Sequence, residues 1–214
     1  MSRWVFRLIV CALIAWAGHA WWSSRPLRQA PGVLVPEAPV QEGTPAQVIQ
    51  RGDFRLTAIA RYKLRGRVLG KKRYWDKPQN QLVPIDVAVG WGRMSDQAVL
   101  DGFSDFTMGN RFFFYEWQRQ PPIPREEIAR SAANNHVIPA DDTVARGIRG
   151  LRRGQIVELQ GWLVEADGPS GFRWVSSRRR DDTGNGACEL FFVEQIATWD
   201  TPPPASAILL TAQP

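Results

Sequence analysis

Residues 59–69, IARYKLRGRVL, decide the predicted fold, because two kinds of side chain alternate along them. Cations stand at every second position, and tyrosine, leucine, glycine and valine stand between them. The four cations are Arg61, Lys63, Arg65 and Arg67. A period of two residues is typical of a strand with one face in the core and one face toward solvent. We therefore predict a half-buried strand whose outer face is positively charged.

Similar patterns on both sides of this segment predict further strands. The alternating or aromatic stretches are 84–92, 111–117, 156–167, 172–177 and 188–197. Short helices are predicted between them. One begins with Ser95 as its N-cap, one follows Pro124, and one is capped by Asp141 or Asp142 and ends at Gly154.

About six strands with two or three short helices predict a mainly β fold of the α+β class. One helix precedes the closing strands, and this order fits a small β-barrel of the oligonucleotide/oligosaccharide-binding (OB-like) kind. Gly161 stands where a long strand would need to coil. A Greek-key sandwich would give nearly the same pattern and stays open as an alternative.

The first 22 residues, MSRWVFRLIVCALIAWAGHAWW, form a hydrophobic segment with a basic start. One interpretation is an uncleaved transmembrane signal anchor, with tryptophans at the membrane boundaries and Arg7 reaching the head groups. The other is a cleaved signal peptide, because the continuous apolar run 8–17 is short. The Trp21–Trp22 pair favours the anchor. We expect a single-pass inner-membrane protein with its domain on the periplasmic side, or secretion to the periplasm after cleavage.

Proline content sets the other boundaries. Five prolines in residues 23–52 predict a semi-extended linker, and at roughly 3 Å per residue it would hold a domain several nanometres from a bilayer. Residues 53–200 are predicted to form the β-barrel domain. Residues 201–214 are again broken by prolines and are predicted to be a C-terminal tail.

The charge balance favours anionic partners, because 27 lysines and arginines exceed 21 acidic residues. Cations cluster on and after the 59–69 strand, with aromatic residues among them. The candidate anionic-ligand site comprises Arg61, Lys63, Arg65, Arg67, Lys71, Lys72, Arg73 and Trp75. Such a set suits single-stranded nucleic acid or anionic lipid. The alternative is a solvated face that protects an edge strand.

Cys188 and His136 are the candidate catalytic pair. A nearby imidazole could activate the thiol, with Asp181, Asp182 or Asn135 orienting the ring. The alternative is a small buried cysteine that opens a strand after a hairpin turn at 182–186, and we favour it. Two histidines and one accessible cysteine predict no metal site, and no cofactor motif is recognised.

Four stretches carry a resemblance: GKKRYW, PIDVAVGWGRMSD, NNHVIPADD and WVSSRRRDDTGNGACELFFVE. They resemble a family of short bacterial exported or membrane-anchored proteins that have an N-terminal hydrophobic segment and no assigned function. The resemblance covers most of residues 60–197 and implies an exported or tethered protein, without an activity.

These observations predict a membrane-tethered periplasmic binding or accessory module with a basic face and no catalysis. Its expected partners are the inner membrane and an envelope protein assembly or an anionic polymer or lipid surface. An exported thiol-dependent enzyme using Cys188 and His136 is the first alternative. A single-stranded nucleic-acid-binding module is the second.

Overall fold

The structure is a computed structural model that describes residues 3–23, 25–76, 79–177 and 188–203. Its helices are α1 (Arg3–Ser23), α2 (Gln79–Leu82), α3 (Gln97–Leu100), α4 (Arg125–Arg130) and α5 (Asp142–Gly150). Its strands are β1 (Val40–Arg51), β2 (Phe54–Arg73), β3 (Ile85–Gly90), β4 (Asp105–Gly109), β5 (Phe112–Glu116), β6 (Ala132–Pro139), β7 (Ile156–Asp167), β8 (Arg173–Val175) and β9 (Glu189–Trp199). Short 3₁₀ turns lie at Gly92–Ser95 and Pro169–Gly171.

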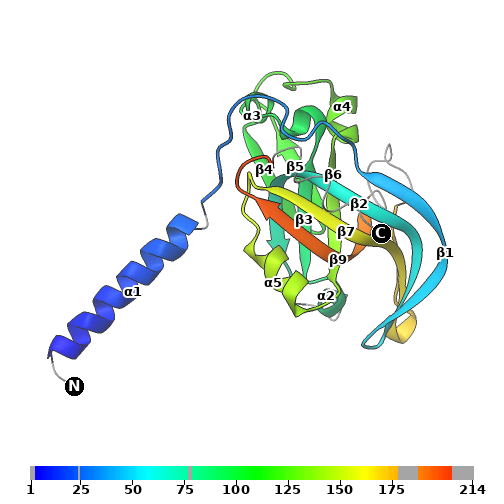
Figure 1. The fold of residues 1–214 in the computed structure, drawn as a ribbon, viewed down its shortest axis with the longest axis horizontal. Helices are drawn as coiled ribbons and strands as arrows, with labels where there is room; N and C mark the ends of the chain where they lie inside the picture. The colour runs from blue at the N-terminus through cyan, green and yellow to red at the C-terminus, as the bar shows by residue number, and fades with distance from the viewer. Residues whose placement is uncertain (1–2, 24, 77–78, 178–187, 204–214) are drawn as a thin grey trace.

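The main sheet closes into a ring (Figure 1). Seven strands follow the order β1-β2-β3-β6-β9-β7-β8, and β2 pairs with β7 as well, so that β2, β3, β6, β9 and β7 surround one core. The β6–β9 pairing is parallel, and the other pairings in this sheet are antiparallel. The predicted mainly β class with short helices is confirmed.

Strand β2 organises the ring, because it pairs with β1, β3 and β7 along its 20 residues. The predicted alternation is confirmed: Tyr62 and Leu64 are fully buried, whereas Arg61, Lys63 and Arg65 are only partly covered. Tyr62 packs edge-to-face on Phe191 across the core, with ring centroids 4.9 Å apart. Burial of such large side chains supplies most of the stability of a small domain.

Gly161 allows the ring to close where β7 meets β9. The register of this pairing shifts between Gln160 and Gly161. A Cβ atom at Gly161 would lie 1.9 Å from the carbonyl oxygen of Phe192, so no larger residue fits without moving the backbone. The predicted role of this glycine in strand coiling is consistent with that close approach.

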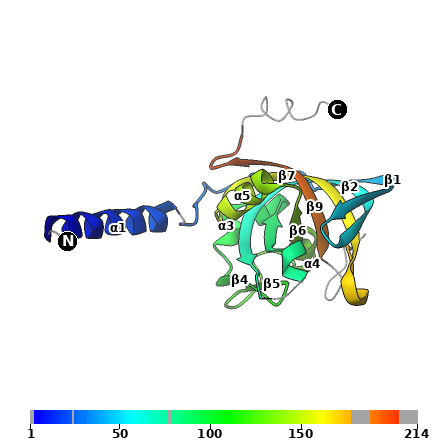
Figure 2. The same ribbon diagram turned by 90° about the horizontal axis from the view of Figure 1, so that it is seen from below.

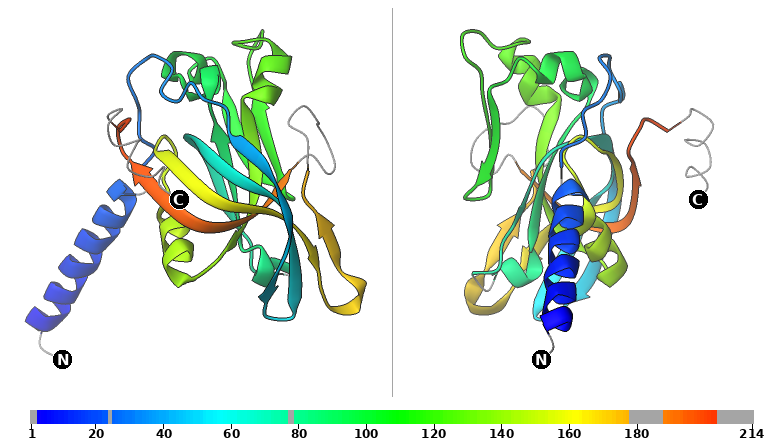
Figure 3. Two further views of the ribbon diagram at one scale, coloured as in Figure 1. Left: turned by 45° about the vertical axis from the view of Figure 1, so that its right-hand side comes forward. Right: turned by 90° about the vertical axis from the view of Figure 1, so that its left-hand side faces the viewer.

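A second sheet, the β4–β5 hairpin, stands beside the ring as the green hairpin in the right-hand view of Figure 3. It encloses its own apolar cluster with Leu69 and Ala88 of the ring. Its two turn residues, Asn110 and Arg111, both have positive φ (50° and 69°), which is typical of tight hairpin turns. Only the second strand of this hairpin was predicted from the sequence.

Most of residues 23–52, predicted to be an extended linker, pack against the folded domain instead. Residues 27–35, which we call the strap, lie along the folded domain: the Leu27 backbone N–H donates to Arg153 O at 2.7 Å, and Gly92 N–H donates to Val35 O at 2.7 Å. Val35 is only 2% exposed and belongs to the core. Residues 40–51, also assigned to the linker, form β1 and pair with β2. The folded unit therefore begins well before residue 53.

Two predicted helix ends also differ from the structure. Asp96, not Ser95, caps the short helix, since its carboxylate accepts from Ala98 N–H. The Ser95 hydroxyl instead accepts from the strap at Leu34 and Val35, both at 3.1 Å. Helix α5 is capped by Asp141 as predicted, but it ends at Gly150 rather than Gly154.

Helix α1 projects away from the ring in Figures 1 and 2. Its large apolar side chains are uncovered, with Trp4 72% exposed, Leu8 70% and Trp16 70%. Across the described residues, no helix reaches the combination of length and apolar character that crossing a membrane requires.

Candidate functional site

Most predicted ligand-binding cations of β2 are engaged within the domain. Arg61 forms a salt bridge with Glu194 of β9 at 2.5 Å and lies over the Trp162 ring. Lys63 and Arg65 both pair with Glu158 of β7, at 3.2 and 2.5 Å. The outer face of β2 is therefore a set of cross-strand ion pairs rather than an open row of positive charge.

Glu158 is the centre of this network. Its side chain is 2% exposed. Burial alone would raise the pKa of Glu158, but hydrogen bonds from Arg65 and Gln160 and the positive charges of Arg65 and Lys63 outweigh burial and lower it. Glu158 is thus charged at neutral pH, and it fixes two of the predicted cations in place.

Arg67 points into the protein, against the prediction of an outward cation. It is 3% exposed and donates to Ser95 O at 3.2 Å, to Leu27 O at 3.4 Å and to the Gln97 side chain. Burial, and then the charge of Arg153, lower the pKa of Arg67 to about 10, so it remains protonated at neutral pH. Its role is to hold the strap and α3 to β2.

The end of β2 is different. Lys71 donates to the carbonyl oxygens of Arg149 and Leu151, the latter at 2.7 Å. Lys72 and Arg73 are exposed and have no ion-pair partner within the described residues, and Trp75 is 81% exposed. Of the predicted set, these last residues alone remain available to a ligand.

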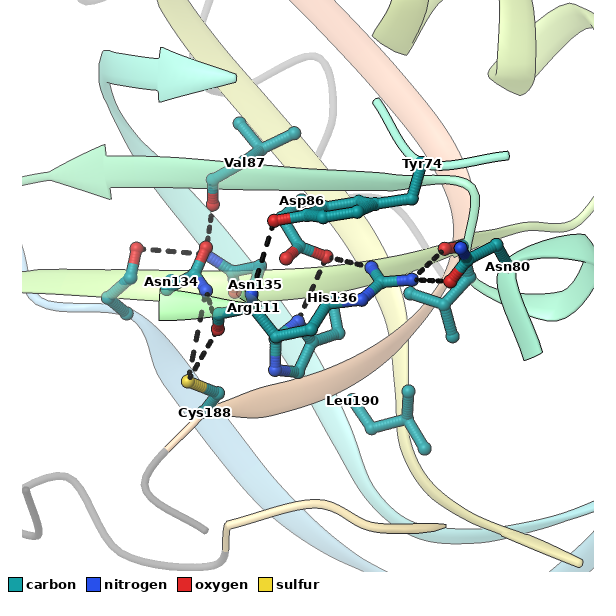
Figure 4. Close-up of polar contacts among 12 residues, drawn as sticks. Tyr74, Asn80, Asp86, Val87, Arg111, Asn134, Asn135, His136, Cys188 and Leu190 are labelled. Atoms are coloured by element: carbon teal, nitrogen blue, oxygen red, sulfur yellow. Dashed lines mark hydrogen bonds and ion pairs between the residues drawn. The ribbon is translucent and has the colours of Figure 1, made fainter. Parts of the chain in front are cut away.

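The predicted catalytic histidine lies in a buried polar cluster on the outer side of β3 and β6 (Figure 4). His136 Nδ1 is 2.9 Å from Asp86 Oδ1, and Asp86 is completely buried. The flanking Ile85 and Val87 belong to the ring core, so Asp86 faces outward, where the β4–β5 hairpin covers it. Trp174 packs against the imidazole at 4.8 Å between ring centroids.

Arg111 joins the hairpin to this cluster. Its guanidinium donates to Asp86 at 2.6 Å, to Val83 O at 2.8 Å and to the Asn80 side chain. It also lies 3.8 Å from the centroid of the Tyr74 ring. Burial raises the pKa of Tyr74, and the neighbouring Asp86 carboxylate raises it further. Arg111 and His136 both contact Oδ1 of Asp86. These contacts hold the β4–β5 hairpin to β3 and β6, which is a structural role.

Cys188 lies beside this cluster, at the start of β9. The Asn134 amide is 3.8 Å from Cys188 Sγ, and the thiol is 3.9 Å from Arg111 O. The parallel β6–β9 register sets His136 opposite Leu190, and Cys188 stands two residues before Leu190, directly before β9 begins. No hydrogen bond between the two residues is found among the contacts described for His136.

The predicted orienting groups are partly replaced. Asn135 donates to Val87 O at 3.2 Å and points away from His136, whose partner is Asp86. Asp181 and Asp182, together with the predicted turn at 182–186, lie outside the described residues. Asp86 left a usable signal in the sequence, since it is a carboxylate inside the apolar run PIDVAVG. Arg111 gave no such signal in the sequence, because its contacts depend on where the β4–β5 hairpin lies.

Within the described ranges, no group of three or more His, Cys, Asp or Glu side chains could hold a metal ion. Comparison of the chain with protein-family models, with curated proteins and with solved structures found no match. The resemblance to exported bacterial proteins therefore stays a prediction, and function has to be argued from the geometry.

Proposed function

We propose that the protein is a membrane-attached accessory module of the bacterial cell envelope whose folded part is an OB-like barrel without catalytic activity. The strand order supports the OB-like part of the proposal. Five strands form the ring, in chain order β2, β3, β6, β7 and β9. The third and fifth of them, β6 and β9, form its single parallel pair. Helix α5 lies in the chain between the third and the fourth, β6 and β7. This order of pairings is the one expected of a small Greek-key barrel, and it supports the proposal.

The observation that carries the proposal is the uncovered apolar surface of α1. Trp4, Leu8 and Trp16 are each at least 70% exposed, and the figures show the helix apart from the domain. An exposed apolar area of this kind is removed from water when it meets lipid. Arg3 and Arg7 near the start of α1 suit contact with anionic head groups. A periplasmic location of the domain stays part of the proposal, although α1 falls short of the length and apolar character of a membrane span.

The strap determines how close the domain would lie to the lipid. Leu27 is already bonded to Arg153, and four residue steps separate it from Ser23 at the end of α1. Four steps span at most about 14 Å. The domain would therefore sit against the membrane surface rather than several nanometres from it.

Membrane fractionation tests this proposal. We expect the full-length chain in the membrane fraction, and the double variant Leu8→Asp/Leu13→Asp in the soluble fraction. Leu8→Ala/Leu13→Ala, which shortens the same side chains without adding charge, should stay with the membrane. Recovery of the unmodified chain in the soluble extract would reject the proposal. Protease digestion of spheroplasts should cleave the domain if it is periplasmic.

A thiol-dependent enzyme is the second candidate, and the His136–Asp86 bond favours it because an aspartate at Nδ1 fixes the imidazole tautomer. In a Cys11→Ser background, this hypothesis expects rapid alkylation of Cys188 by iodoacetamide in the native protein, slowed several-fold by His136→Gln. Alkylation that requires denaturant in both proteins would eliminate it. The shared contact of Asp86 with Arg111 is why we rank this candidate second.

The nucleic-acid hypothesis has lost its main support, because Arg61, Lys63 and Arg65 pair with carboxylates instead of forming an open phosphate track. If the hypothesis holds, single-stranded oligonucleotides must bind with an affinity that falls steeply as salt rises.

A further inference from the structure

A cavity of about 500 Å³ lies at the end of β2, between the second sheet and the turn that joins α5 to β7. We call it the basic cavity, because five of the residues that line it are cations. These are Lys71, Lys72, Arg149, Arg152 and Arg153. None of the lining residues is acidic.

The charges of the basic cavity are poorly compensated. Arg152 pairs with the exposed Asp200 at 2.7 Å. Within the described part of the chain, Lys72 and Arg149 have no carboxylate within salt-bridge distance, and both are exposed. Burial lowers the pKa of Lys71, and the charge of Arg73 lowers it further. Burial also lowers the pKa of Arg153, and the charge of Asp105 only partly offsets this.

The rest of the cavity wall is apolar. Leu69, Phe106 and Met108 line it together with the cations. The Arg153 guanidinium lies over the Phe106 ring, 4.8 Å from its centroid, and is held there. A ligand that suits this wall combines a compact anion with an apolar portion.

The basic cavity also lies next to the attachment point. Arg153 accepts the first strap hydrogen bond from Leu27. A neighbouring cavity of about 300 Å³, lined by Pro26 and Leu27, shares Leu69 and Arg153 with it. Since Leu27 is at most about 14 Å of chain from α1, the basic cavity lies at the level of lipid head groups when α1 is in a membrane.

We propose that the basic cavity binds the phosphate of an anionic phospholipid head group, with Lys72 and Arg149 as the principal contacts. The lipid as the source of that phosphate rests on the proposed membrane attachment. Each cation near an anionic surface typically changes the binding equilibrium about fivefold.

Flotation with vesicles tests both parts separately. Full-length protein is mixed with phosphatidylcholine vesicles, with or without roughly 30% phosphatidylglycerol, which gives the surface a negative potential. We expect binding to neutral vesicles through α1, and at least tenfold tighter binding with phosphatidylglycerol. The variant Lys72→Gln/Arg149→Gln should lose most of this increment and keep neutral binding. The control Arg51→Gln/Arg55→Gln removes the same charge from exposed positions near the opposite end of β2 and should keep the increment.

The outcomes are distinguishable. Equal losses in both double variants would show a diffuse charge effect and overturn the basic cavity as a site. Absence of binding to neutral vesicles would overturn the attachment. In that case calorimetry, with glycerol 3-phosphate titrated into the full chain in detergent, distinguishes a lipid phosphate from a soluble one. Saturable binding that is lost in Lys72→Gln/Arg149→Gln would retain phosphate recognition but reject the lipid as its source. Absence of binding would reject the site.

Discussion

The cations in the middle of β2 and those around its C-terminal end have similar charge but different surroundings. Arg61, Lys63 and Arg65 face the carboxylates of β7 and β9 and are fixed by them. Lys72 and Arg149 face a cavity without an acidic residue. A run of positive charge therefore indicates a binding surface only where the neighbouring strands leave it unpaired.

The largest loss in the free energy of unfolding should come from breaking the ion pairs in the middle of β2. Glu158→Gln leaves Arg65 and Lys63 without their shared anion, and removal of one partner from a buried ion pair costs about 3 kcal/mol. Urea denaturation followed by circular dichroism measures the loss. The matched variant Glu194→Gln affects a pair whose side chains are about one-third exposed, so it should lose about 1 kcal/mol or less. Equal losses would contradict the central role of Glu158.

The strap gives the next largest effect. Gly154 has φ +92°, and a Cβ there would lie 1.9 Å from Leu27 O. Gly154→Ala should therefore displace the strap and lower the free energy of unfolding by about 2 kcal/mol. Gly150→Ala adds the same methyl group where no atom lies within 4 Å and should change it by less than about 0.5 kcal/mol. If the strap were not docked in solution, Gly154→Ala would lose only the backbone strain of its positive φ, on the order of 1 kcal/mol.

Acid should reduce the stabilisation that the Glu158 ion pairs give to the folded protein. The pKa of Glu158 is lower in the folded protein than its ordinary value of 4.5, so the unfolded chain takes up this proton first as pH falls. The stabilisation by Glu158 is fully present above that value and is lost as pH falls through the folded pKa. The stability difference between the unmodified protein and Glu158→Gln should therefore shrink below about pH 4.5. A difference that is constant with pH would contradict the ion pairing.

The smallest stability effect is expected at the basic cavity. Lys72→Gln/Arg149→Gln removes exposed charges without a described carboxylate partner, so the free energy of unfolding should change by less than about 0.5 kcal/mol or increase. A loss comparable with that of Glu158→Gln, measured in the same urea experiment, would mean that these cations are structural as well, and the contrast would disappear.

The alternation in residues 59–69 and 156–167 was enough to predict the central strands. In β2 it reflects a half-buried strand up to Arg65, whereas β7 is buried along most of its length, so there the pattern located the strand but not an exposed face. Strand β1 was not predictable in this way. It is polar, carries Pro45 within the register shift between Gly43 and Gln47, and is defined only by its pairing with β2.

The sites were less predictable than the fold, because they depend on partners distant in sequence. Positions 61, 63 and 65 gave no sign that Glu158 and Glu194 would face them. The ion pair between Arg111 and Asp86 depends on a hairpin turn with positive φ. The arginines at 149, 152 and 153 could have been noticed as a basic run, but only the packing of α5 against the end of β2 brings them to Lys71 and Lys72.

Hydrogen–deuterium exchange of the full-length protein on vesicles tests the central contrast most directly. We expect slower exchange at residues 149–153 on phosphatidylglycerol vesicles than on phosphatidylcholine vesicles, with no difference at the β1–β2 hairpin tip, residues 51–55. Equal exchange at 149–153 on both lipids, or protection confined to 51–55, would contradict it.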